Sequence, residues 1–132
     1  ERVRDVAHGR EPTVAEDGPE FSAEDRVTAL GDGAGIKLKD SAAITNPTVH
    51  RRLPALAEER EIPHQPEIRP TGGTDTAGLQ FAGGATPAGA ISFPTRYLHT
   101  VTESIHVDDI EAGIDLLVAA VDTADGSTDY RL

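Results

Sequence analysis

The chain has 132 residues, enough for one domain with a single core, and it carries a formal net charge of −11. Its lysines are limited to Lys37 and Lys39, so we expect no nucleic-acid partner, because phosphate binding needs concentrated positive charge. The lack of cysteine excludes disulfides and thiolate metal sites, and no run of about 18 apolar residues predicts a membrane span. We expect a cytoplasmic protein whose acidic surface is adapted to high salt, with simple solubility as the alternative reading.

The first third of the chain is expected to be rich in loops. The sequence begins within a predicted strand around residues 3–7, so we expect it to be a piece of something longer. Residues 9–35 are rich in glycine, proline and acid and predict a loop-rich surface excursion before a short strand at 35–38. A helix should follow Asn46 and run to about residue 60, with a kink or a break at Pro54.

The remaining segments alternate between strands and helices. "IPHQPEI" predicts a linker entering a strand, "TGGTDTAGLQFAGG" a glycine turn opening a short helix, and "PAGAISF" a buried strand. The last helix is predicted from an Asp108 and Glu111 capping box and from one apolar stripe: Val107, Ile110, Ile114, Leu117, Val118 and Val121. Residues 122–132 are expected to form a flexible tail. The pattern favours an α/β fold, a layered sheet flanked by helices, with residues 1–132 as a single partial domain.

Several polar residues are candidates for a site. None of the five histidines forms a His-Glu-x-x-His pair, so any metal site must combine distant segments. His8 lies three residues after Asp5, at the exit of the expected first strand. The backbone amides of Thr71 to Gly78 could hold an anion at the start of a helix, although a tight structural turn is the more common meaning of this pattern.

Three stretches resemble the C-terminal part of the dinuclear zinc aminopeptidases, the tetrahedral, glutamyl and deblocking enzymes whose homologues are often labelled endoglucanase or cellulase. They are "NPTVHRRLPALAEEREIPHQPEI", "GGTDTAGLQFAGGATPAGAISFPTRYLHT" and "VDDIEAGIDLLVAAV". Near the N-terminus, "DVAHGREP" is similar to that family's Asp-Val-Thr-His strand exit. The resemblance implies the C-terminal part of a zinc-peptidase catalytic domain, acting on a peptide substrate within a homo-oligomer.

The resemblance also implies a set of site residues. Asp5 falls on the aspartate that binds one metal in the family, and His99 on the histidine that binds the other. The metals would be two zinc or cobalt ions, which activate a bridging water, and the donor atoms of Asp5 and His99 would then lie within roughly 8 Å of each other. The residues expected beside this site are His8, Gly72, Gly73, Thr74, Asp75, Arg96 and Tyr97.

The chain also departs from the family pattern. The other metal ligands and the general base lie upstream of the Asp-Val-Thr strand in the family, so we expect no catalytic base in this chain and little or no activity from it alone. Ala7 replaces the usual threonine, and Thr100 and Val101 replace Ser-Pro after the histidine. The favoured function is therefore a segment of a metal-dependent aminopeptidase.

Two other functions stay open at this point. The chain could be a non-catalytic α/β module that has lost the chemistry. A polysaccharide hydrolase, as the endoglucanase label would have it, is less favoured because such enzymes commonly offer aromatic surfaces to sugars, and this chain has no tryptophan.

Overall fold

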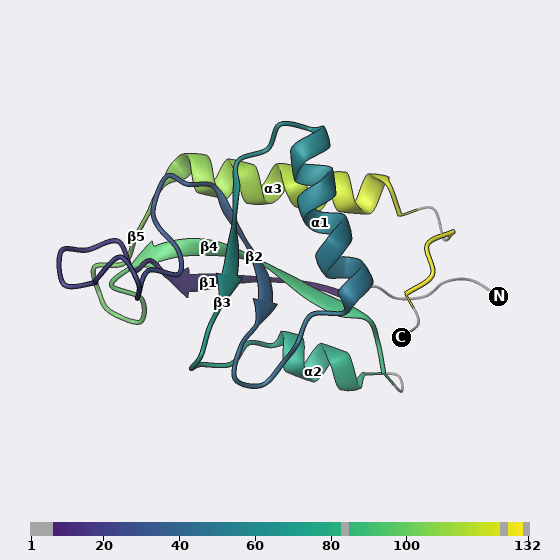
Figure 1. The fold of residues 1–132 in the computed structure, drawn as a ribbon, viewed down its shortest axis with the longest axis horizontal. Coiled ribbons are helices and arrows are strands. Elements are labelled where there is room, and N and C mark those ends of the chain that lie inside the picture. The colour runs from purple at the N-terminus through teal and green to yellow at the C-terminus, as the bar shows by residue number, and fades with distance from the viewer. Residues whose placement is uncertain (1–6, 83–84, 125–126, 131–132) are drawn as a thin grey trace.

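The computed structural model describes residues 7–82, 85–124 and 127–130. Within these ranges the chain forms a sheet with helices on both faces (Figure 1). The strands are β1 (Ala7–Val14), β2 (Ala34–Lys39), β3 (His64–Ile68), β4 (Ala88–Arg96) and β5 (Ser104–Ile105). The helices are α1 (Pro47–Glu59), α2 (Thr76–Phe81) and α3 (Val107–Asp122). This arrangement confirms the predicted layered α/β fold.

The sheet has the strand order β1-β4-β2-β3, and the short β5 pairs with the end of β4. β1 runs parallel to β4, and β2 runs parallel to β3, whereas β2 and β4 are antiparallel. β4 is therefore the central strand that joins two parallel pairs. Residues far apart in the sequence meet across it, as where Glu11 and Gly35 both lie opposite Ser92.

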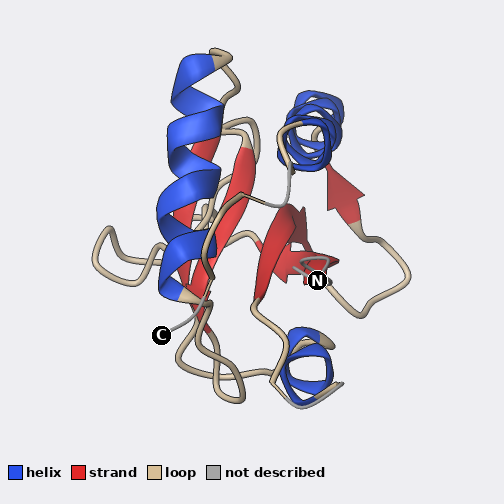
Figure 2. Cartoon of the chain, turned by 90° about the vertical axis from the view of Figure 1, so that its right-hand side faces the viewer, coloured by secondary structure: helices blue, strands red, loops and turns tan. Residues whose placement is uncertain are grey.

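Close glycine contacts set the spacing of the layers. On one face, a Cβ on Gly89 would lie 2.6 Å from Val49 of α1, and one on Gly113 of α3 would lie 2.3 Å from the Phe93 ring. On the other face, a Cβ on Gly9 would lie 2.9 Å from Thr76 of α2. Glycine thus lets α1 and α3 approach one face and α2 the other, and Figure 2 shows the helices on both sides of the strands.

The core lies between the sheet and the pair α1 and α3. Its fully buried side chains are small or branched, chiefly Ile36, Val49, Leu53, Ile91 and Leu116. Such residues fill the narrow space that the glycine contacts leave.

The first strand corrects one expectation. The predicted excursion over residues 9–35 is too long, because residues 9–14 belong to β1 and pair with β4 along its whole length. Glycine and proline have low strand propensity, so the local sequence does not predict a strand here. Pairing with the buried central strand β4 supplies the hydrogen bonds that form it. The irregular segment is confined to the residues between β1 and β2.

Helix α1 begins as predicted and passes through Pro54 without a break. Asn46 caps it by accepting hydrogen bonds from the backbone N–H groups of Thr48 and Val49. The expected break at Pro54 does not occur, because the buried Leu53, Leu56 and Ala57 anchor the helix to the core on both sides of the proline. Tertiary packing thus compensates for the lost backbone hydrogen bond.

Helix α3 is present as predicted, but the face that it buries is the one opposite to the predicted apolar stripe. None of the six residues of the predicted apolar stripe is buried, and four of them are exposed: Val107, Ile114, Val118 and Val121. The sheet instead contacts the face that carries Ala112, Gly113, Leu116, Ala119 and Ala120. The reason is steric, since only small residues allow the close approach at Phe93.

The start of α3 also differs from the prediction. The cap is His106, whose Nδ1 accepts a hydrogen bond from the backbone N–H of Asp108 at 3.3 Å, so Asp108 lies inside the first turn rather than at the cap. The neighbouring Asp109 is fully buried and accepts hydrogen bonds from the N–H groups of Gly31 and Gly33. This carboxylate ties the helix to the loop before β2.

Residues 122–132 were expected to form a flexible tail. The first of them, Asp122, is instead the last residue of α3, and residues further along contact the rest of the molecule. The Asn46 side chain donates to the carbonyl of Tyr130, and Arg52 donates to the Thr128 hydroxyl. Tyr130 also packs against the core. The described tail residues are therefore attached to α1, which polar composition alone does not indicate.

Among the described residues, no helix has the length and apolar character needed to cross a membrane.

Candidate functional site

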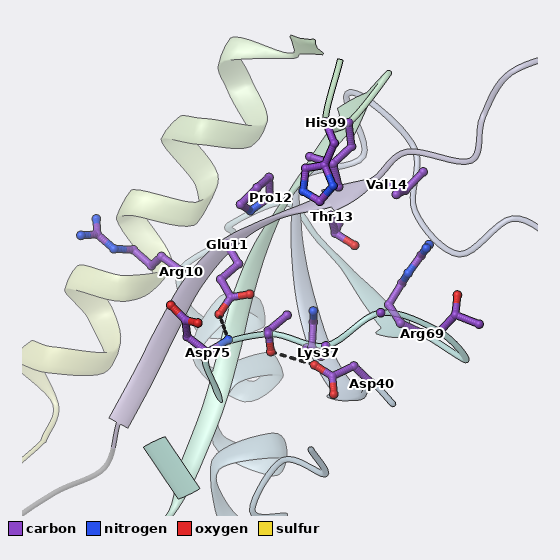
Figure 3. A pocket seen from close by; sticks show the side chains of 15 residues that line it. Arg10, Glu11, Pro12, Thr13, Val14, Lys37, Asp40, Arg69, Asp75 and His99 are labelled. Carbon is purple, nitrogen blue, oxygen red and sulfur yellow. Dashed lines mark hydrogen bonds between the residues drawn. The ribbon is translucent and has the colours of Figure 1, made fainter. Parts of the chain in front are cut away.

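A pocket of about 550 Å³ opens on the sheet face opposite α1 and α3, beside the ends of β1 and β2 (Figure 3). The loops that follow β2, β3 and β4 complete its walls. Its lining consists of Arg10, Glu11, Pro12, Thr13, Val14, Lys37, Asp40, Arg69, Thr71, Gly72, Gly73, Thr74, Asp75, Leu98 and His99. Charged groups of both signs therefore face one cavity.

Strand alternation places the central residues of this pocket. Glu11 and Thr13 lie two residues apart on β1, so their side chains share a face. Lys37 of β2 pairs with Glu67 of β3 in the parallel register, which puts these two on the same face as well. In Figure 3 the Lys37 side chain stands between Glu11 on one side and Arg69 on the other.

Lys37 and Glu67 form a buried ion pair beneath the pocket. The Lys37 Nζ lies 3.3 Å from the Glu67 Oε1, and the two side chains are 4% and 0% exposed. The Thr13 hydroxyl donates a hydrogen bond to the same oxygen at 2.6 Å. The other oxygen, Glu67 Oε2, is buried with no hydrogen-bond partner. The pocket therefore has a rigid cationic floor held by a carboxylate beneath it.

Glu11 supplies a carboxylate on the wall of the pocket. Its Oε1 accepts a hydrogen bond from the backbone N–H of Asp75 at 2.7 Å. Partial burial raises the pKa of Glu11 above its ordinary value, although the Asp75 amide and the charge of Lys37 act in the opposite direction. Glu11 is thus a carboxylate whose basicity exceeds that of a solvated glutamate.

Asp40 organises the glycine turn that forms another wall. Burial alone would raise its pKa, but hydrogen bonds from the Thr74 hydroxyl and from the backbone N–H groups of Ala42 and Ala43 outweigh this effect and lower it. Ser41 also donates to the Gly72 carbonyl at 2.6 Å. The end of β2 therefore fixes the turn that precedes α2.

His99 lies in the loop after β4, on the far side of the pocket from Asp40 and Asp75 (Figure 3). Its backbone φ is +65°, and that of Tyr97 is +56°, a region that residues other than glycine seldom adopt. The backbone N–H of His99 donates to the Glu103 Oε1 at 2.5 Å. The strained loop presents the imidazole at the pocket rim with its side chain exposed.

Arg96 anchors this loop to the segment after β1. Its guanidinium donates two hydrogen bonds to the Asp17 carboxylate, at 2.7 and 2.9 Å. The Arg96 hydrogen bond lowers the pKa of Asp17 and, reciprocally, raises that of Arg96. The pair holds the chain at the base of the His99 loop.

The structure separates the sequence-predicted site residues into three groups. Those that line the pocket are Gly72, Gly73, Thr74, Asp75 and His99. Those that lie elsewhere are His8, Arg96 and Tyr97, of which His8 has its Nδ1 buried without a partner and a pKa lowered by burial and then by the charge of Arg52. Asp5 lies outside the described residues, so its predicted distance to His99 stays untested.

Sequence reasoning missed five charged residues of the pocket: Arg10, Glu11, Lys37, Asp40 and Arg69. A signal for Glu11 exists in the alternation of Gly9, Glu11 and Thr13, but it is visible only if residues 9–14 are taken as a strand. Lys37 and Asp40 are separated from Glu11 by more than twenty residues, and only the β1-β4-β2 order brings them to one face.

The pocket residues whose donor atoms suit a borderline divalent metal are the carboxylates of Glu11, Asp40 and Asp75 and the imidazole of His99. A catalytic zinc site needs three protein ligands, and the described part of the chain contains no group of three or more such residues that could hold a metal. The described residues therefore do not form a metal site by themselves, and we assign no reaction step to a metal held by them.

Comparison with known proteins shows that the chain is similar to a group of aminopeptidases. A curated Acetivibrio thermocellus protein whose name places it among the aminopeptidases is 36% identical over 117 residues, which cover 89% of this chain and 35% of that protein. Aminopeptidase APDkam598 of the archaeon Desulfurococcus kamchatkensis superposes with a TM-score of 0.88 at 31% identity, over 91% of this chain and 34% of that one. The PhTET1-12s protein, solved as a dodecamer, superposes with a TM-score of 0.66 at 26% identity, over 88% of this chain and 32% of that one.

The chain thus spans about a third of the length of the relatives it matches. Residues 4–116 match the family described as M42 glutamyl aminopeptidase. The matched stretch includes every strand and every pocket-lining residue described above. The chain belongs to the M42 glutamyl aminopeptidase family.

Proposed function

We propose that this chain is the substrate-pocket part of an aminopeptidase that removes N-terminal residues from peptides, with the pocket holding the side chain of the first residue. The observation that carries the proposal is the cavity that Lys37, Glu11 and His99 share at the strand ends. A peptide N-terminus is an ammonium group beside a polar carbonyl, and a pocket with fixed charges of both signs can orient it. The family match supports the same reaction class.

Within this proposal His99 contributes an imidazole and Glu11 a carboxylate. The acid-x-Thr spacing of the family motif recurs at Glu11-Pro12-Thr13, whose residues line the pocket together with His99, whereas Asp5-Val6-Ala7 has alanine in place of the threonine. We therefore put Glu11 forward as an alternative to Asp5. Zinc or cobalt bound by a complete ligand set would activate water and polarise the scissile carbonyl, while these residues would orient the substrate beside it.

The pocket favours an acidic first residue. Lys37 is held at its floor by Glu67, and Arg69, which is itself paired with Glu16 at 2.6 Å, adds a second cation on the wall. A glutamate or aspartate side chain entering the pocket would meet these cations, whereas a leucine side chain would offer them no hydrogen-bond acceptor. The printed name of the family points to the same substrate class.

The test compares substrates and variants of the protein expressed from its own gene. We expect release of p-nitroaniline from glutamyl p-nitroanilide at a higher kcat/KM than from leucyl p-nitroanilide, with no reducing sugar released from cellulose. Lys37→Met should lower this glutamyl preference at least 10-fold, while Lys39→Met, which alters an exposed lysine on the same strand, should leave it unchanged. Cellulose hydrolysis without peptidase activity would overturn the proposal.

Binding provides a readout that needs no catalysis. In titrations followed by amide chemical shifts, L-glutamate should perturb Gly72, Gly73 and residues near Lys37, and the perturbation should disappear in Lys37→Met. Perturbation by L-leucine equal to that by L-glutamate would contradict the proposed preference.

A second candidate function is a non-catalytic module that retains the fold. The observation that favours it is the absence, among the described residues, of three ligands for one metal. Metal analysis of the protein expressed from its own gene separates the two: two bound metals per chain support the enzyme, and none, together with no peptidase activity, supports the module. We further propose a homo-oligomeric enzyme, as the dodecameric neighbour suggests, and light scattering of the same preparation would measure this.

A further inference from the structure

We propose that Glu16 is a built-in competitor for the acidic side chain that the pocket receives. Glu16 holds Arg69, so an entering carboxylate must compete with it for the guanidinium, and the acidic amino acid that the reaction releases leaves the pocket more readily. The occupant is the acidic first residue of the proposed function, on which this inference rests. Glu16 is a positioning residue, since it acts through Arg69 and does not line the pocket itself.

The contact between Glu16 and Arg69 is close but single. The Arg69 Nη1 donates to the Glu16 Oε1 at 2.6 Å, and each of the two side chains is 14% exposed. The other oxygen, Glu16 Oε2, accepts the backbone N–H of Val27 at 3.1 Å, which holds the carboxylate in place. A guanidinium carries five donors, and this contact uses one of them. Arg69 can therefore serve a second acceptor in the pocket.

A neighbouring ion pair has the more complete geometry. The Asp17 carboxylate, next along the chain, accepts two hydrogen bonds from Arg96, at 2.7 and 2.9 Å. Two parallel bonds of this kind fix both partners. Arg96 does not line the pocket, whereas Arg69 does. Of these two arginines, the one that reaches the pocket is thus the one that its carboxylate holds less completely.

Arg69 is placed to meet an acidic ligand together with Lys37. The backbone N–H of Arg69 donates to the Lys39 carbonyl at 2.9 Å, which fixes its Cα beside the end of β2. In Figure 3 Arg69 lies on the side of Lys37 away from Glu11. Because Arg69 lines an open pocket, the loss of Glu16 does not seal its charge away from water.

The competition has a defined sign. Without the negative charge of Glu16, an entering carboxylate would meet the full charge of Arg69, and opposite charges a few ångströms apart attract strongly where water is partly excluded. Ordering one arginine side chain costs entropy, but this cost is smaller than the effect of a fixed carboxylate at hydrogen-bond distance. An acidic ligand should therefore bind more tightly without Glu16. Because the gain applies to substrate and product alike, KM for a glutamyl substrate should fall while kcat should not rise.

Amide chemical-shift titrations of the protein expressed from its own gene measure this effect without catalysis. Glu16→Gln, which keeps the shape of the side chain, should lower the dissociation constant of L-glutamate about 10-fold and change that of the uncharged L-glutamine less than about 2-fold. Glu16→Asp keeps the charge and should bind L-glutamate as the parent does. Glu24→Gln is the matched control, because Glu24 is an exposed acid of the same segment between β1 and β2, and it should have no effect.

A double-mutant cycle tests whether Glu16 acts through Arg69. In an Arg69→Met background, the effect of Glu16→Gln on L-glutamate binding should fall below about 2-fold. The amide spectrum of each variant without ligand checks that the fold is retained.

Two results would overturn the inference and leave the acidic preference standing. One is an L-glutamate dissociation constant that Glu16→Gln leaves unchanged or raises, and the other is equal tightening of L-glutamate and L-glutamine. If L-glutamate bound neither the parent nor any variant, the proposed acidic preference would fall, and this inference with it.

Discussion

Lys37 and Glu67 are thirty residues apart in the sequence, yet their charged atoms lie 3.3 Å apart on neighbouring strands under the candidate pocket. The register of β2 and β3 pairs the two residues directly. The burial of Glu67 is complete, so its charge depends on Lys37 and on the Thr13 hydroxyl for compensation. This relationship connects the stability of the sheet to the charge of the pocket.

Lys37→Met should therefore destabilise the chain strongly. Removing one partner of a buried ion pair costs about 3–5 kcal/mol, because the other charge stays buried without compensation. Urea unfolding at pH 7 measures this loss. The double variant Lys37→Met with Glu67→Met should recover much of it, and Lys39→Met should change the free energy of unfolding by less than about 0.5 kcal/mol. A loss below about 1 kcal/mol in the single variant would contradict the interpretation.

Asp17→Asn should change how stability depends on pH. The Arg96 hydrogen bond lowers the pKa of Asp17 in the folded chain below the ordinary value of 3.8. A lowered carboxyl pKa stabilises the fold above the ordinary pKa, and this contribution is lost as the pH falls through the folded value. The stability difference between the parent chain and Asp17→Asn should thus be largest near neutral pH and shrink below pH 3.8. Chemical unfolding at several pH values measures it, and a difference independent of pH would refute the assignment.

Gly33→Ala and Gly78→Ala should have opposite effects. Gly33 has a φ of +90°, and a Cβ there would lie 2.2 Å from the Pro63 backbone, so we expect a loss of more than about 2 kcal/mol. Gly78 lies within α2 with nothing within 4 Å of the added atom, so alanine should stabilise by about 0.5–1 kcal/mol. Thermal unfolding of both variants checks the pair. Similar unfolding temperatures would show that neither backbone conformation is as described.

Pro54→Ala should stabilise the chain. α1 is continuous through this residue, and alanine would restore the backbone donor that proline lacks in a helix interior. We expect a gain of about 1–3 kcal/mol, the upper end being the usual cost of an interior proline. The urea midpoint measures the change. A decrease would indicate that the proline ring contributes packing that outweighs the missing hydrogen bond.

Sequence alone determined the elements with strong local signals in this protein. Asn46 with Pro47 indicated the start of α1, the glycine turn before α2 indicated that helix, and the small residues of β4 indicated a buried strand. The family also followed from short motifs whose residues are close together in the chain. In each case neighbouring residues carry the information, so no knowledge of distant contacts is needed.

Only the tertiary structure decided the features that depend on distant partners. β1 exists because it pairs with β4, and α3 buries its alanine and glycine face because only a small residue lets the helix approach Phe93 of β4 closely. Periodicity identifies apolar faces, but it cannot rank two of them when the choice depends on steric fit to another layer. The pocket also depends on distant partners, because Glu11, Lys37 and His99 line one cavity only through the order of the strands and the loops that connect them.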